Sequence, residues 1–284
     1  MGESAEALQA CFAGLIDIAL AICTGALLLR SFMAREIQAH VLCLALIAMA
    51  IGLGGSLWAA AASMSGAEGA AVWQAMPAVL TQTAYGHATM FAGMAWCGLL
   101  GAFLVRHRAA WAHVAWCSIA ILCVAHAAGG HAIDAGWISY AIWMHALHIA
   151  GGCVWAGTVF LAAGLALSWR SWDVAQRLTF ARRISRAATF ALAVVAVSGA
   201  LNTWRMLGIS GISFSDSYTV LLAAKLVCVG FAMCLGGYNR WRVMPVLMEK
   251  GSARQFAAVL LIEAAVLSVA MVLAAKLGTT MPPM

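Results

Sequence analysis

Long apolar segments joined by short basic connections are the feature that most constrains how this chain can fold. A helix that crosses the hydrocarbon core of a bilayer needs about 20 mostly apolar residues. We identify eight such segments, near residues 8–29, 40–62, 79–105, 111–128, 138–167, 187–207, 218–238 and 256–276. We therefore predict an all-α, polytopic membrane bundle of about eight transmembrane helices, forming one integral membrane domain over residues 1–284.

The composition points the same way. Only 9% of the residues are charged, against about 25% in soluble domains. A net charge of +6 suggests nucleic-acid binding in a soluble protein, but here the basic residues lie between apolar segments. We expect lipid as the surroundings and no nucleic-acid partner. The nine cysteines all fall in apolar segments without a CxxC pair, so we interpret each as a packing residue rather than part of a disulfide framework.

The basic residues define a topology. The connections after the first, third, fifth and seventh segments carry 13 of the 16 Lys and Arg residues. Lys and Arg concentrate in cytoplasmic loops of membrane proteins. We therefore predict that these connections face the cytoplasm and that both termini lie on the periplasmic or exterior side of the membrane.

Histidines gather in the half of the membrane that this topology assigns to the outside. They are His87, His126, His131, His145 and His148, on three neighbouring segments. His145 and His148 are three residues apart, so they share one helix face and can point into one site. Gly151 and Gly152 follow one turn later and permit close helix packing. Polar groups inside a membrane are costly and usually functional.

One segment also combines an imidazole with two thioethers. His87, Met90 and Met94 lie at positions i, i+3 and i+7, on one helical stripe. Imidazole and thioether ligands together suit copper, and thioethers favour Cu(I). Each methionine alone is better explained by core packing, and His87 alone equally well by a hydrogen-bonded core position, but the convergence of five histidines favours a metal site.

Three further charged residues lie within apolar segments: Asp17, Lys225 and Glu263. Each needs a partner or a change of protonation, because an isolated charge in the membrane is unfavourable. Lys225 can neutralise Asp17 or Glu263 in a structural pair. Alternatively, the three residues couple transport to protons or line a metal path, and spacing leaves both interpretations open.

The second half of the chain resembles the CopD/PcoD family of copper resistance membrane proteins. The resemblance is carried in order by HALHIAGGCVWAG (145–157), SRAATFALAVVAVSGALNTW (185–204) with its Ser-Gly pair, SYTVLLAAKLVCVG (217–230), NRWRVMP (239–245) and a final segment containing Glu263. It is strongest over residues 140–276. The first half resembles the family in its helix layout and in the acidic residue of its first helix. One departure is that the glycine pair precedes Trp155 instead of following it.

The resemblance implies copper passage across the bacterial inner membrane, beside a periplasmic copper carrier of the CopC type, by a protein that is not an enzyme. It implies His87, His126, His131, His145 and His148 as copper ligands, assisted by Met90 and Met94. The sequence contains neither a DKTG nor a GxxxxGK[ST] motif, so transport is expected to be passive or driven by a gradient or potential. A ligand cluster facing outward favours uptake from the periplasm.

Other functions compete with this one. A b-type cytochrome holds haem between histidines, and His113 and His126 have a spacing that stacked haems use, but no second segment repeats it. A membrane hydrolase is disfavoured because neither an HExxH motif nor a Ser-His-Asp set is visible. A copper-insertion or assembly factor is not separable from a transporter by sequence. The copper oxidation state, the number of sites and a homodimeric state also stay open.

Overall fold

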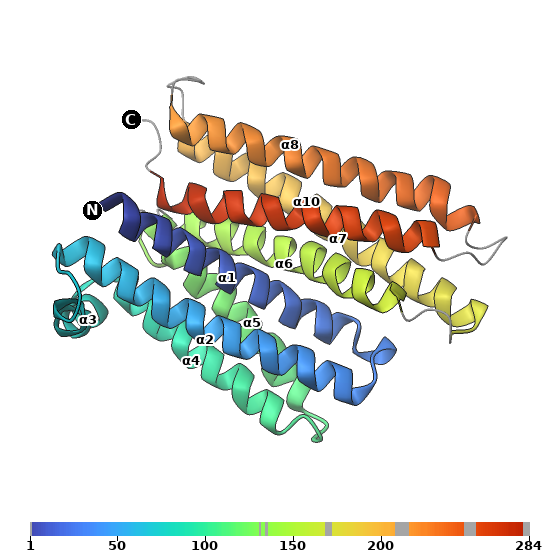
Figure 1. The fold of residues 1–284 in the computed structure, drawn as a ribbon, viewed down its shortest axis with the longest axis horizontal. Coiled ribbons are helices and arrows are strands. Elements are labelled where there is room, and N and C mark those ends of the chain that lie inside the picture. Colours follow the sequence, from blue (N-terminus) through green and yellow to red (C-terminus); the bar gives the residue numbers. More distant parts are fainter. Residues whose placement is uncertain are drawn as a thin grey trace.

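The computed structural model describes residues 2–130, 132–133, 136–167, 172–207, 216–246 and 254–280. Its long helices run roughly alongside one another, up and down, as one bundle (Figure 1). They are α1 (Gly2–Leu28), α2 (Arg35–Ser65), α4 (Ala84–Leu104), α5 (Trp111–Ala128), α6 (Tyr140–Leu167), α7 (Val174–Leu207), α8 (Ser217–Tyr238) and α10 (Arg254–Thr279). The short helix α3 (Ala71–Gln82) does not run along the bundle but lies at the end where α1 begins (Figure 1). A 3-10 turn, η1 (Arg30–Phe32), follows α1, and a π-helical turn, η4 (Asn239–Val243), extends α8.

Eight helices of the described chain are long and apolar enough to cross a membrane. This confirms the prediction of an all-α polytopic bundle, and the protein is a multi-pass membrane protein. Both termini lie at the same end of the bundle, as an even number of spans requires (Figure 1). The connections that carry most of the basic residues lie at the opposite end. Which end faces the cytoplasm stays a prediction.

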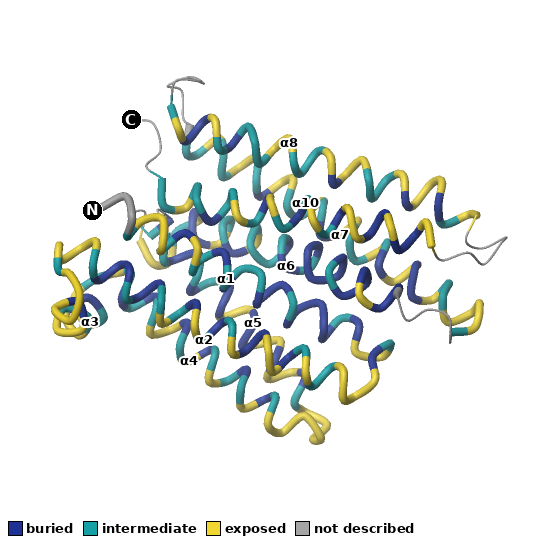
Figure 2. Tube along the Cα trace, viewed as in Figure 1, coloured by how far each residue is buried: buried dark blue, intermediate teal, exposed yellow. Residues whose placement is uncertain are grey.

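The core of the bundle lies along α1 and α6. Of the apolar stretch of α6, 67% is buried inside the protein, against 6% for α8. Figure 2 shows the same contrast, with buried residues concentrated in the middle of the bundle and exposed ones along its outer helices. Because α7 and α8 bury so little of their surface, most of their apolar side chains face outward, where lipid replaces protein as the packing partner.

The crossing of α1 and α6 is unusually close. A Cβ atom at Gly157 would overlap the carbonyl oxygen of Ala21, and one at Gly25 would overlap the carbonyl oxygen of Gly157. Small residues let two backbones touch in this way, and in a membrane such contacts provide much of the packing energy between helices. The crossing therefore fixes the relative position of the two helices that carry most of the site described below.

Two boundaries differ from the sequence prediction. The segment predicted at 79–105 is divided at Thr83, where the backbone is extended. The Thr83 side-chain oxygen accepts a hydrogen bond from Gly86 N at 2.9 Å and caps the start of α4. The preceding part belongs to α3, a short helix containing Pro77. The segment predicted at 187–207 begins instead at Val174. Asp173 and Gln176 cap its start reciprocally, since Asp173 Oδ1 accepts from Gln176 N at 2.7 Å and Gln176 Oε1 from Asp173 N at 3.3 Å.

Candidate functional site

A cavity of about 290 Å³ lies in the half of the bundle that contains both termini. Its lining comes from α1, α2, α4, α5, α6, α7, α8 and α10, so nearly the whole bundle encloses it. Most of the lining is apolar. The polar groups used below are Asp17, His126, His145, His148, Trp155, Arg205 and Lys225.

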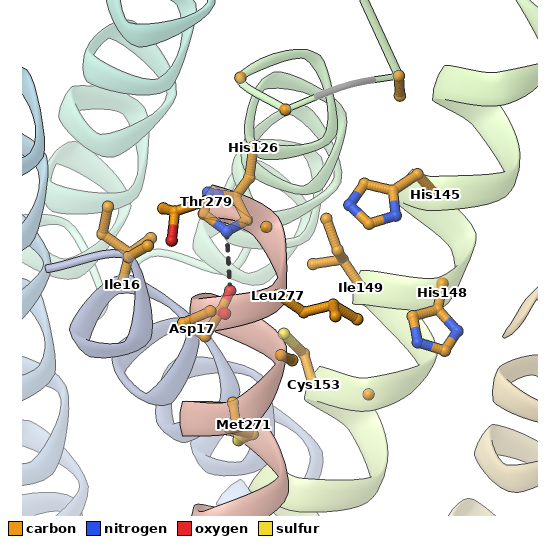
Figure 3. Close-up of a pocket in the computed structure, with 18 of the residues that line it drawn as sticks. Ile16, Asp17, His126, His145, His148, Ile149, Cys153, Met271, Leu277 and Thr279 are labelled. Carbon is orange, nitrogen blue, oxygen red and sulfur yellow. Dashed lines mark ion pairs between the residues drawn. The ribbon is translucent and has the colours of Figure 1, made fainter. Parts of the chain in front are cut away.

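Asp17 and His126 form an ion pair across the cavity, drawn as a dashed line in Figure 3. The distance from His126 Nε2 to Asp17 Oδ1 is 3.0 Å, and the side chains are 25% and 16% exposed. Asp17 lies near the middle of α1 and His126 in the last turn of α5. The partner of the carboxylate is therefore an imidazole, and not Lys225 as one interpretation of the sequence proposed.

His145 and His148 line the cavity from α6, one turn apart (Figure 3). His148 Nδ1 lies 3.2 Å from Ser198 Oγ on α7. The Ser198 hydroxyl donates its own proton to the Val194 carbonyl at 2.6 Å, so it accepts from Nδ1–H of His148. Nε2 of His148 then carries the lone pair, which is the arrangement that a histidine needs to bind a metal.

The Ser-Gly pair on α7 makes room for this imidazole. A Cβ atom at Gly199 would lie 3.0 Å from His148 Cε1, tighter than ordinary contacts. Gly151 makes the corresponding contact from α6, since a Cβ there would lie 3.0 Å from Val195. The two helices therefore approach closely where the histidine is held. The sequence contained this signal in its Ser-Gly pair, although its connection with His148 becomes apparent only in the structure.

Two cationic side chains also line the cavity. Lys225 of α8 is within electrostatic range of Asp17, His145 and His148, and within the described residues it forms no ion pair. Arg205, in the last turn of α7, has a buried Nε without a hydrogen-bond partner in the described chain. The cavity thus has acidic, basic and imidazole groups facing one another.

Glu263 lies outside the cavity lining, behind Trp155. Its side chain is 3% exposed, and its Oε1 accepts a hydrogen bond of 3.0 Å from Nε1 of Trp155. Trp155 itself lines the cavity. The indole therefore separates the cavity from the carboxyl group while holding that group in place.

The histidine–methionine stripe lies elsewhere. His87 Nε2 is 3.0 Å from the carbonyl oxygen of Thr81, and Met90 and Met94 are exposed on the surface of α4. None of the three lines the cavity within the described residues. His131 lies outside the described residues. Among the residues described, no group of three His, Cys, Asp or Glu side chains is assembled closely enough to hold a metal ion.

Sequence reasoning missed two sulfur-bearing residues. Cys153 of α6 and Met271 of α10 both line the cavity, on its deeper side (Figure 3). The cysteine had been interpreted as a packing residue, and the methionine was not singled out. A signal existed in the spacing for a neighbouring thiol, because Cys123 precedes His126 by three residues on α5.

The family comparison agrees with the resemblance read from the sequence. The model of copper resistance protein D, the CopD family, matches residues 178–277. The match spans most of α7, all of α8 and most of α10, and so includes Ser198, Lys225 and Glu263. Asp17, His126, His145 and His148 lie outside it. No curated protein and no solved structure matches the chain. The CopD match supports a role in copper resistance or transport.

Proposed function

We propose that this protein transports copper ions across the bacterial inner membrane, from the periplasm inward, through the cavity lined by His126, His145 and His148. The observation that carries the proposal is the pair of imidazoles on α6 facing Asp17 and His126 in a cavity, in a chain whose C-terminal part matches CopD. Copper is the cargo here and not a resident cofactor.

The tautomer of the His148 imidazole supports a role in binding copper. Its Nδ1–H is used by Ser198, so Nε2 is the nitrogen available to a metal ion. Because three ligands are not preassembled in the described residues, the imidazoles converge only when an ion arrives. A site of this kind binds loosely enough to release its ion, as transport requires.

The driving force fits inward movement. A cation gains about 2.3 kcal/mol per charge per 100 mV when it moves to the negative side of a membrane. A periplasmic carrier of the CopC type is the expected donor. His87, Met90, Met94 and His131 have no assigned role in the cavity under this proposal, while Asp17, Lys225 and Glu263 shape the charge along the path.

The haem alternative has less support. His113, the partner that the spacing on α5 suggested for His126, is exposed near the opposite end of that helix. His113 and His126 therefore do not face one common site. An absorption spectrum separates the two possibilities directly.

The test compares purified wild type with His145→Ala/His148→Ala, after copper loading in detergent and again in proteoliposomes. His87→Ala is the matched control, since it removes an imidazole outside the cavity. We expect bound copper and uptake to fall in the double variant and to persist in the control, without a Soret band. Equal copper uptake by all three proteins, or a Soret band in the wild type, overturns the proposal.

A further inference from the structure

Three buried cysteines come together below the histidines. They are Cys23 of α1, Cys123 of α5 and Cys153 of α6, which are 0%, 2% and 3% exposed. All nine cysteines are free thiols. The other six are exposed or partly exposed, so the burial of these three distinguishes them from the rest. All three buried thiols belong to the same core cluster.

The thiols interact with one another and with the cavity. The Cys153 thiol interacts with the Cys123 thiol, and the Cys23 thiol and the Asp17 carboxylate are near enough to affect it electrostatically. Cys153 also lines the cavity, as does the thioether of Met271 (Figure 3). An ion in the cavity therefore reaches sulfur without crossing another layer of side chains.

The order along the helices places sulfur deeper than imidazole. With a rise of about 1.5 Å per residue, Cys123 lies about 4.5 Å from the level of His126, and Cys153 about 7.5 Å from that of His148. Cys23 lies about 9 Å beyond Asp17 by the same rise. On all three helices the displacement runs away from the end that carries the termini.

We propose that Cys123 and Cys153, with Cys23 and Met271 beside them, form a second copper station that takes Cu(I) from the histidines above. Soft thiol and thioether ligands select Cu(I), and Cu(I) accepts two such ligands in a linear arrangement. This is compatible with the absence of a preassembled three-ligand group among the described residues. The inference rests on the proposed function and adds the oxidation state of the cargo.

Charge and protons balance at this station. One thiol binds as a thiolate and releases its proton, so one Cu⁺ and one thiolate sum to zero, and the second sulfur binds as a neutral ligand. A neutral centre is the form that a buried apolar site tolerates. The released proton leaves through the cavity, which Cys153 lines. The copper arrives already reduced, so the station performs no redox step.

The decisive experiment measures Cu(I) binding by the purified full chain in competition with a colorimetric Cu(I) chelator, under reducing conditions. It compares wild type, Cys123→Ser/Cys153→Ser, and the control Cys43→Ser/Cys117→Ser, whose thiols are exposed. We expect affinity to fall more than about 100-fold in the first variant, beyond what the loss of an outer-shell partner costs. X-ray absorption of the wild type should show copper–sulfur bonds.

A second measurement does not depend on the variant folding. Wild-type protein is treated with a small methanethiosulfonate reagent, with and without Ag(I) as a redox-inert substitute for Cu(I), and labelled cysteines are mapped by mass spectrometry. We expect Ag(I) to protect Cys153 and to leave Cys43 reactive.

The outcomes separate this inference from the proposed function. Unchanged Cu(I) affinity in Cys123→Ser/Cys153→Ser, only nitrogen and oxygen ligands, or no protection by Ag(I) overturns the sulfur station. In that case, copper uptake that still depends on His145 and His148 leaves the proposed function intact. Conversely, sulfur-bound Cu(I) without any uptake supports the station and overturns transport.

Discussion

A single hydroxyl group orients the imidazole on which the proposed site depends. Ser198 accepts from His148 Nδ1 while donating to Val194. Ser198→Ala removes that acceptor and leaves the ring free to rotate or change tautomer. Loss of such a partner costs about 10–100-fold in metal affinity, and we expect a decrease of that size in copper binding measured by competition.

The matched control for this prediction is Ser268→Ala on α10. The Ser268 hydroxyl also donates to a carbonyl of the preceding turn, Ala264 O. Ser268 does not line the cavity. Equal copper affinity in Ser198→Ala and Ser268→Ala would contradict the role assigned to Ser198.

A second residue-scale prediction concerns Trp155. Trp155→Phe keeps the aromatic bulk but removes the indole N–H that donates to Glu263. The buried Glu263 carboxyl group then lacks this hydrogen bond. Interhelical hydrogen bonds in membrane proteins contribute about 0.6 kcal/mol on average and up to about 1.7. We expect a loss near the upper value, measured by unfolding in detergent mixtures.

Trp96→Phe serves as the comparison, because its indole donates at 3.0 Å to the backbone carbonyl of Leu46 on α2. We expect that variant to lose about the average value. Adding Glu263→Leu to Trp155→Phe should recover part of the loss, since both partners are then apolar. A larger loss in Trp96→Phe than in Trp155→Phe contradicts the prediction.

At the scale of elements, the α1–α6 crossing is the most demanding contact. Gly157→Ala places a methyl group on the Ala21 carbonyl, against backbone that cannot rotate away. We expect destabilisation of about 3 kcal/mol or more, seen as poor recovery of folded protein by size-exclusion chromatography. Gly164→Ala, on the exposed side of the same helix with open space around it, should stabilise α6 by about 1 kcal/mol.

Element boundaries show what a sequence conveys and what it does not. The length of the apolar segments alone predicted eight spans, because each span needs about 20 consecutive apolar residues and these can be counted in the sequence. It did not predict that α7 begins at Val174, since that first part is basic and polar, and the reciprocal cap of Asp173 and Gln176 is what starts it. Division of the third segment at Thr83 depended likewise on a cap, not on hydropathy.

At the scale of the whole molecule, the cavity and the basic loops lie at opposite ends. If the positive-inside rule holds, both termini are periplasmic. Alkaline phosphatase fused to the C-terminus should then be active, and fused after Arg106 inactive; a green fluorescent protein should give the reverse pattern. An inactive C-terminal phosphatase with an active one after Arg106 contradicts the proposed direction of transport.

The candidate site was partly predictable at this scale. His126, His145, His148 and Asp17 reach one cavity because alternating spans bring their outer halves together, which topology alone implies. Topology does not say which face of its helix a residue occupies. His87 and Met94 do not line the cavity, and Cys153 lines it without having been singled out.

The glycine crossing has a consequence for kinetics. Directly inward of Cys23 and Cys153, the backbones of α1 and α6 touch at Gly25 and Gly157, so the cavity cannot continue along this seam as an open pore. In the transport that we propose, each ion has to wait until these two packed helices separate and close again. Flux should therefore saturate with copper concentration and rise steeply with temperature, as in a carrier whose turnover is limited by a conformational step rather than by diffusion.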